Sequence, residues 1–219
     1  HMFAMMMGMQ KTLHLYRDDQ FQGAWNDYGQ IASISNATVV INGLGDIGLY
    51  FGTLAKALGA YVIGVKRRPA VCPDEIDELV LSEEFERVIP RADVIFSILP
   101  NTDETRGIYD ASFFSLMKET AIFMNAGRGN AVNQEALLEA VQAGHIKGAA
   151  LDVTDPEPLP SGHPLWKEPN IFITPHVSGQ FHLPETLERI VEIAIYNLSA
   201  YKEGRSLKNT IDPSTGYCR

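Results

Sequence analysis

The stretch TVVINGLGDIG, residues 38–48, constrains the fold more than any other part of the chain. It opens with an apolar run that is typical of a buried strand, and a helical pattern of apolar residues follows over 47–59. Between them lie Gly43, Gly45 and Gly48 in the spacing GxGxxG. The first two glycines allow a tight turn that a phosphate can approach closely, and the third lets the helix pack on the strand.

This strand–glycine loop–helix pattern predicts a dinucleotide site. The backbone amides of Asp46 and Ile47 open the helix, where N–H groups and the helix dipole attract phosphate. The alternative is a turn that is rich in glycine by chance. GxGxxG also occurs in sites for S-adenosylmethionine, so a methyltransferase is a second alternative.

Apolar runs and helical patterns alternate along most of the chain. Continuous apolar strands between helices predict an α/β fold of the Rossmann type, a doubly wound parallel sheet with helices on both faces. We expect this dinucleotide-binding domain to span 31–219 and to end in a long helix. Strands are expected at 37–42, 61–65, 78–81, 93–99, 120–126, 148–153 and 171–174, and helices at 47–59, 82–92, 111–119, 133–144 and 184–204.

The first 30 residues have a different pattern. A Met-rich helix is expected over 3–16, followed by an irregular polar arm over 17–30 that carries Trp25. The methionines are typical of packing rather than of a cofactor contact. The segment either covers its own domain or packs on a second subunit.

Composition excludes several classes of protein. The formal net charge is −9 and the pI about 5.1, which argues against a nucleic-acid partner. No apolar run approaches the length of about 20 residues of a membrane span. The two cysteines, Cys72 and Cys218, form no CxxC pair, so we expect no disulfide framework, no metal site and a reducing cytoplasm.

The second predicted strand ends in Lys66, Arg67 and Arg68. Dinucleotide sites for NAD usually place an Asp or Glu about 20 residues after the glycine loop, where it binds the ribose hydroxyls. Guanidinium groups instead match a phosphate with paired hydrogen bonds. The basic residues therefore favour NADP over NAD, the alternative being an ordinary solvated turn.

Four motifs follow in order: LPNTDETRG (99–107), NAGRGN (125–130), ALDVTDPEPLP (150–160) and ITPHVSG (173–179). Together they resemble the D-isomer-specific 2-hydroxyacid dehydrogenases, over about Phe3 to Tyr217. The resemblance implies an NAD(P)-dependent oxidoreductase that moves a hydride between a nicotinamide cofactor and a 2-oxo acid or D-2-hydroxy acid, as in glyoxylate/hydroxypyruvate reductases.

The resemblance also implies roles for individual residues. Arg128 matches the arginine that holds the substrate carboxylate, His176 the catalytic acid/base, and Glu157 its acidic partner. The chemistry agrees, since a histidine titrates near neutrality, a carboxylate behind its ring fixes the tautomer, and an arginine clamps a carboxylate with two hydrogen bonds. Other histidines are expected to be structural or on the surface: His14, His145, His163 and His182.

Further positions match cofactor contacts in the family. Asp152 matches a residue near the nicotinamide carboxamide. The remaining expected contacts are Leu99, Pro100, Thr105, Ala126, Gly127, Ser178 and Gly179, together with Arg128 and His176 themselves.

The chain departs from the family at its start. Members carry an earlier segment that builds much of a second domain over the substrate, and His1-Met2 resembles the remnant of an expression tag. We therefore expect the cofactor domain of a longer protein, poorly active by itself. The resemblance implies a homodimer formed through this domain and its N-terminal arm. Because some relatives are corepressors, a non-catalytic dinucleotide sensor is an alternative function.

Overall fold

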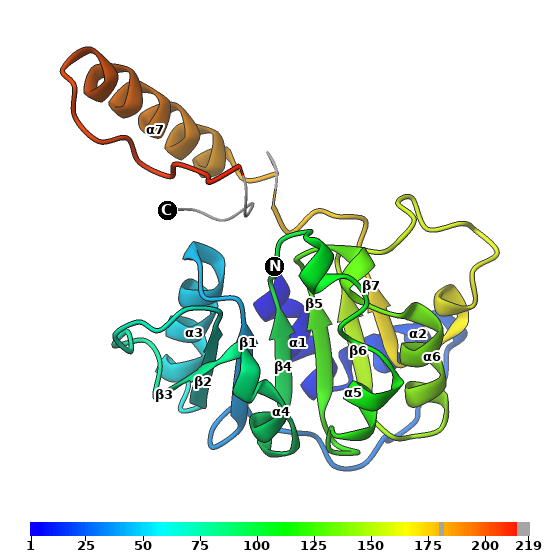
Figure 1. Ribbon diagram of the computed structural model, residues 1–219. Helices are drawn as coiled ribbons and strands as arrows, with labels where there is room; N and C mark the ends of the chain where they lie inside the picture. The colour runs from blue at the N-terminus through cyan, green and yellow to red at the C-terminus, as the bar shows by residue number, and fades with distance from the viewer. Residues whose placement is uncertain (180–181, 214–219) are drawn as a thin grey trace.

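The computed structural model describes residues 1–179 and 182–213. Its centre is a sheet of seven strands in the order β3-β2-β1-β4-β5-β6-β7, and all neighbouring strands pair in parallel (Figure 1). This arrangement confirms the Rossmann-type doubly wound fold. The strands are β1 Thr38–Asn42, β2 Tyr61–Lys66, β3 Glu78–Leu81, β4 Val94–Ser97, β5 Ile122–Asn125, β6 Gly148–Leu151 and β7 Ile171–Ile173.

Helices cover both faces of the sheet, and each face has its own core. One core packs α1 and α3 against the sheet through Met6, Phe51 and Phe96, and the other packs α4, α5 and α6 through Val88, Phe113 and Leu137. The helices are α1 Met2–Gln10, α2 Leu13–Gln22, α3 Asp46–Ala57, α4 Phe85–Val88, α5 Ala111–Ser115, α6 Gln134–Gln142 and α7 Pro184–Lys202.

The strand order reverses between β1 and β4. From β1 the chain runs outward through β2 and β3, then returns to β4 on the other side of β1 and continues to β7. In open parallel sheets, loops diverge at such a point and leave a crevice at the carboxyl ends of the strands. The sheet therefore places a crevice beside the glycine loop that follows β1.

The N-terminal segment differs from the expectation in two ways. The Met-rich helix stops at Gln10, because Thr12 adopts a left-handed backbone with φ of 53°. A second helix, α2, then occupies the first part of the expected irregular arm. The helix α1 packs on its own sheet and buries Met2, Met5, Met6 and Met9, whereas Trp25 in the following arm is fully exposed.

The helix expected over 82–92 is also different. The segment forms a 3₁₀ turn at Ser82–Glu84, the short helix α4, and a second 3₁₀ turn at Ile89–Arg91. Pro90 lies in that second turn and has no backbone N–H to donate.

The helix α7 extends away from the sheet (Figure 1), and Ala200 is its one buried residue. Its exposed apolar side chains are Leu187, Ile190, Val191, Ile195, Leu198 and Tyr201.

Candidate functional site

A cleft of about 1780 Å³ opens at the carboxyl edge of the sheet. This volume exceeds the 300–1,000 Å³ that is usual for small-molecule pockets. Most of the residues expected to bind a cofactor or substrate line it: Gly43, Gly45, Asp46, Ile47, Lys66, Arg67, Arg68, Leu99, Pro100, Thr105, Ala126, Gly127, Arg128, His176, Ser178 and Gly179. The expected residues outside its wall are Gly48, Asp152 and Glu157.

The three loop glycines meet different surroundings. Gly43 has φ of +111°, and a Cβ there would lie 2.7 Å from the Ile98 carbonyl oxygen. A Cβ on Gly48 would overlap the Gly43 carbonyl oxygen, so this glycine lets α3 pack against the loop. Gly45 instead has an ordinary φ of −96°, and a Cβ there would meet open space at the cleft wall. Folding therefore requires glycine at 43 and 48, whereas at 45 glycine keeps the cleft wide.

The N-terminus of α3 faces this space. The helix begins at Asp46, directly after Gly45, and its first amides have no partner within the helix. These N–H groups and the glycine surface fit a pyrophosphate group.

The end of β2 supplies three cations to one side of the cleft. Lys66 is half-buried, and Arg67 and Arg68 are exposed. An acid lies beside one of them, with Glu104 Oε2 3.6 Å from Arg67 Nη1. The side chains of Arg67 and Glu104 are 32% and 72% exposed, so solvent screens this ion pair.

The loop after β4 is held by Thr105. Its hydroxyl donates to the Pro100 carbonyl oxygen at 2.7 Å and accepts from the Thr102 amide at 3.0 Å. Thr105 is buried, and it fixes the backbone of the 3₁₀ turn Asp103–Thr105 at the cleft wall.

The loop after β5 carries Arg128. Buried Asn125 ties this loop together, because its side chain accepts from the Gly127 amide at 3.0 Å and donates to the Arg128 carbonyl at 2.9 Å. The Arg128 guanidinium donates to the Gly127 carbonyl oxygen at 2.6 Å. A Cβ on Gly129 would overlap the Thr154 backbone, so glycine lets this loop pack directly on the loop after β6.

Asp152, which follows β6, organises the loop after β7. Its side chain is fully buried, and its carboxylate accepts from the Thr174 hydroxyl at 2.5 Å and the Val177 amide at 2.9 Å. It also accepts from the amide and hydroxyl of Ser178, at 2.9 and 2.5 Å. The structure thus directs the Asp152 side chain into this loop rather than into the cleft.

His176 lies within that loop in a left-handed backbone conformation, with φ of 56°. Few residues other than glycine adopt this conformation, and such strain collects at functional sites. The His176 amide donates to the Asp152 carbonyl oxygen at 2.8 Å, which helps to hold the strained residue.

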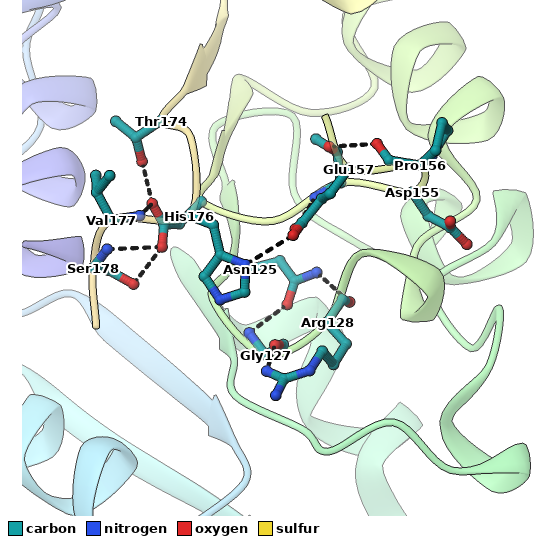
Figure 2. Close-up of polar contacts among 12 residues, drawn as sticks. Asn125, Gly127, Arg128, Asp155, Pro156, Glu157, Thr174, His176, Val177 and Ser178 are labelled. Carbon is teal, nitrogen blue, oxygen red and sulfur yellow. Dashed lines mark hydrogen bonds and ion pairs between the residues drawn. The ribbon is translucent and has the colours of Figure 1, made fainter. Parts of the chain in front are cut away.

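The His176 ring meets Glu157. Their side chains point toward each other in Figure 2, with His176 Nδ1 2.8 Å from Glu157 Oε2, and Arg128 lies on the adjoining loop. The other carboxylate oxygen of Glu157 accepts from the Thr154 amide at 3.1 Å. Both partners are about one-third exposed. The structure therefore brings the expected His–Glu pair together at the cleft.

Sequence reasoning missed residues that shape the site. Asn125 and Thr174 were not singled out, although both lie in quoted motifs, and Glu104 was quoted only as part of a motif. A polar residue at the end of an apolar strand was a usable signal for Asn125. Nothing in the sequence indicated the Glu104–Arg67 ion pair, because it joins two loops that are far apart in the chain.

In the part of the chain that the structure describes, no helix is both long and apolar enough to cross a membrane. The same residues contain no group of three or more His, Cys, Asp or Glu side chains placed to hold a metal ion.

Comparison with known proteins assigns this geometry to a family. Residues 3–178 match the model of the D-isomer-specific 2-hydroxyacid dehydrogenase NAD-binding domain. The match ends before α7, so the inclusion of α7 in the same domain stays a prediction.

Curated relatives include human glyoxylate reductase/hydroxypyruvate reductase, 33% identical over 196 residues that cover 86% of this chain and 58% of that protein. Glyoxylate/hydroxypyruvate reductase B of Escherichia fergusonii is 40% identical over 130 residues, which cover 59% of this chain and 40% of the relative. The chain thus spans between two-fifths and three-fifths of the length of the curated relatives it matches.

Solved structures of reductases and dehydrogenases share the fold of this chain. The NADPH-dependent glyoxylate/hydroxypyruvate reductase of Sinorhizobium meliloti, solved with NADP and sulfate, has a TM-score of 0.86 at 26% identity and covers 99% of this chain and 68% of that one. A D-isomer-specific 2-hydroxyacid dehydrogenase of Xanthobacter autotrophicus, solved with NADPH and MES, has a TM-score of 0.83 at 29% identity and covers 96% of this chain and 84% of that one. The extent of the family match and the shared fold give one conclusion: this chain belongs to the D-isomer-specific 2-hydroxyacid dehydrogenases.

Proposed function

We propose that this chain is the cofactor-binding part of a reductase that uses NADPH, in preference to NADH, to reduce a small 2-oxo acid to a D-2-hydroxy acid. The observation that carries the proposal is the His176–Glu157 pair, 2.8 Å apart, at a cleft that also contains the glycine loop and Arg128. One cleft then contains a phosphate-binding loop, a proton donor and a cation for a carboxylate.

The residues present fit a nicotinamide dinucleotide. Gly45 leaves room for a pyrophosphate beside the amides that open α3, and the cations that end β2 lie where an adenosine 2′-phosphate would be bound. When bound, the cofactor supplies the hydride in reduction and takes it up in oxidation. The presence of NADP in one structural neighbour and NADPH in another supports the preference for the phosphorylated cofactor.

His176 would donate the proton. Adding a hydride to a ketone leaves negative charge on its oxygen, and a proton must reach that oxygen. Because Glu157 binds Nδ1, the other ring nitrogen, Nε2, is the one that exchanges a proton with substrate.

Arg128 would orient the substrate. A guanidinium has five N–H donors, and the hydrogen bond to the Gly127 carbonyl oxygen uses one of its terminal nitrogens. The side chain is exposed at the cleft wall and can turn to clamp a carboxylate with two parallel hydrogen bonds. This clamp would place the 2-oxo group beside His176.

Replacement of His176 by Asn tests the proposal, in a protein of the relatives' full length that carries this sequence. With glyoxylate or hydroxypyruvate as substrate, we expect kcat to fall by about 10²–10⁴-fold, the usual contribution of general acid–base catalysis. The Kd for NADPH should change less than about twofold. A matched control is His145→Asn, which replaces an exposed histidine on the loop before β6.

Unchanged turnover in His176→Asn would reject His176 as the acid/base. NADPH binding without turnover of any 2-oxo acid by the unaltered protein would instead favour the dinucleotide-sensing alternative.

A further inference from the structure

Glu104 lies beside Arg67, one of the cations that would hold a phosphate at the end of β2. The two side chains project from the loops that follow β2 and β4, the strands on either side of β1, and lie 3.6 Å apart at the cleft. We propose that Glu104 competes with the adenosine 2′-phosphate for Arg67 and thereby limits how strongly the site prefers NADPH over NADH. This inference rests on the proposed function.

The position of Glu104 is fixed by its backbone. The neighbouring Thr105 is buried, and its hydroxyl joins Pro100 and Thr102 in the hydrogen bonds that close the 3₁₀ turn. The exposed Glu104 side chain extends from this anchored turn toward the cations that end β2. The acid is thus held near Arg67 without itself being buried.

The charge on the cofactor determines whether Glu104 weakens or strengthens its binding. A 2′-phosphate carries between one and two negative charges and would be repelled by the Glu104 carboxylate while it binds Arg67. NADH has a 2′-hydroxyl at the same place, and a carboxylate accepts hydrogen bonds from ribose hydroxyls. Glu104 therefore opposes NADPH and leaves NADH unaffected or slightly favoured.

Other acids also line the cleft. Glu83 and Glu86, which lie in and after the 3₁₀ turn that follows β3, also face this space. Glu104 is the one among these three for which the structure describes an ion pair with Arg67. A phosphate that binds Arg67 would therefore compete with this carboxylate.

The test is Glu104→Gln, which removes the charge and keeps the shape. The variant is titrated with NADPH and with NADH in a calorimeter at low ionic strength. We expect it to bind NADPH about two- to fivefold more tightly than the unaltered chain does. This range equals about 0.4–1 kcal/mol at 1.4 kcal/mol per tenfold change, as expected for an exposed pair. The Kd for NADH should change less than twofold or rise, and added salt should reduce the gain.

Asp103→Asn is the matched control, because it removes the same charge from the same turn at an exposed residue outside the cleft wall. Combining Glu104→Gln with Arg67→Gln tests whether Glu104 acts through Arg67. If the two compete as proposed, Glu104→Gln should no longer increase the affinity for NADPH when Arg67 is absent.

The inference is overturned if Glu104→Gln and Asp103→Asn behave alike, or if the full gain persists without Arg67. Those outcomes leave the proposed function intact when the unaltered chain still prefers NADPH. A preference of the unaltered chain for NADH, or binding of neither cofactor, would overturn both proposals.

Discussion

At the scale of single residues, the two glycines at either end of the GDIG turn have different physical roles. Gly48 is required by packing, because any Cβ would overlap the Gly43 carbonyl oxygen. Gly45 has a backbone that any residue adopts and open space around its missing Cβ. Folding alone therefore does not explain glycine at 45, whereas a phosphate that approaches the backbone does.

The pair Gly45→Ala and Gly48→Ala separates these roles. Gly45→Ala should change the free energy of unfolding by less than about 0.5 kcal/mol, since the smaller chain entropy of the unfolded state offsets a poorer helix cap. It should weaken NADPH binding at least tenfold. Gly48→Ala should lose binding and also destabilise the fold by about 1–3 kcal/mol, the usual cost of overpacking.

Urea unfolding and NADPH titration of both variants check these expectations. Normal NADPH affinity in Gly45→Ala would show that no phosphate lies against this glycine.

The sequence was enough to predict which residue types meet at the site, but it did not predict which neighbouring loops those residues also bind. His176 and Glu157 were expected to pair, and they lie 2.8 Å apart. The expected place of Asp152 near the nicotinamide stays a prediction, and its buried carboxylate binds the loop that carries His176. A carboxylate at a strand end can turn toward the ligand or toward a neighbouring loop, and the sequence does not determine which.

At the scale of elements, the strands were predicted best, because a continuous apolar run has few alternatives inside a parallel sheet. The helix α2 was not predicted as a separate element, because its start was included in the helix expected over 3–16 and the rest in the irregular arm. Its sequence LHLYRDDQFQ has no apolar face, and Asp19 is its one buried residue. Local contacts stabilise it instead, including Arg17 over the Phe21 ring at 3.9 Å and a left-handed Gly23 at its end. Periodicity cannot detect a helix of this kind.

The cap of α5 gives a pH-dependent prediction. Asp110 accepts from the Ser112 hydroxyl at 2.6 Å and the Phe113 amide at 3.0 Å, and these hydrogen bonds, that from Ser112 foremost, lower the pKa of its carboxyl. A lowered pKa stabilises the folded state above the unfolded value near 4, and this stabilisation is lost as the pH falls through the folded value. Asp110→Ala should therefore cost about 1 kcal/mol at pH 7 and progressively less below pH 4.

Urea unfolding between pH 2.5 and 7 measures this difference. The control is Glu119→Ala, at an exposed acid that follows the same helix. A cost for Asp110→Ala that stays constant or grows in acid would contradict the assigned cap.

At the scale of the whole molecule, the chain places its polar chemistry at one edge of the sheet. The loops after β1, β2, β4, β5 and β7 all contribute residues to a single cleft. The loop after β6 carries Glu157 and Asp152, and Asp152 binds the loop after β7. The Rossmann topology could be predicted because strand and helix patterns alternate. The direction of α7 could not, because its apolar residues indicate a helix but not what that helix packs against.

The central claim is that this cleft binds a nicotinamide dinucleotide and prefers the one with a 2′-phosphate. The direct measurement is calorimetric titration of the chain with NADPH and NADH under identical low-salt conditions, repeated with Arg67→Gln and Arg68→Gln together. We expect the unaltered chain to bind NADPH at least tenfold more tightly than NADH, and the double variant to lose most of that difference with little change for NADH. Tighter binding of NADH by the unaltered chain would contradict the preference, and binding of neither cofactor would contradict the assignment of the cleft.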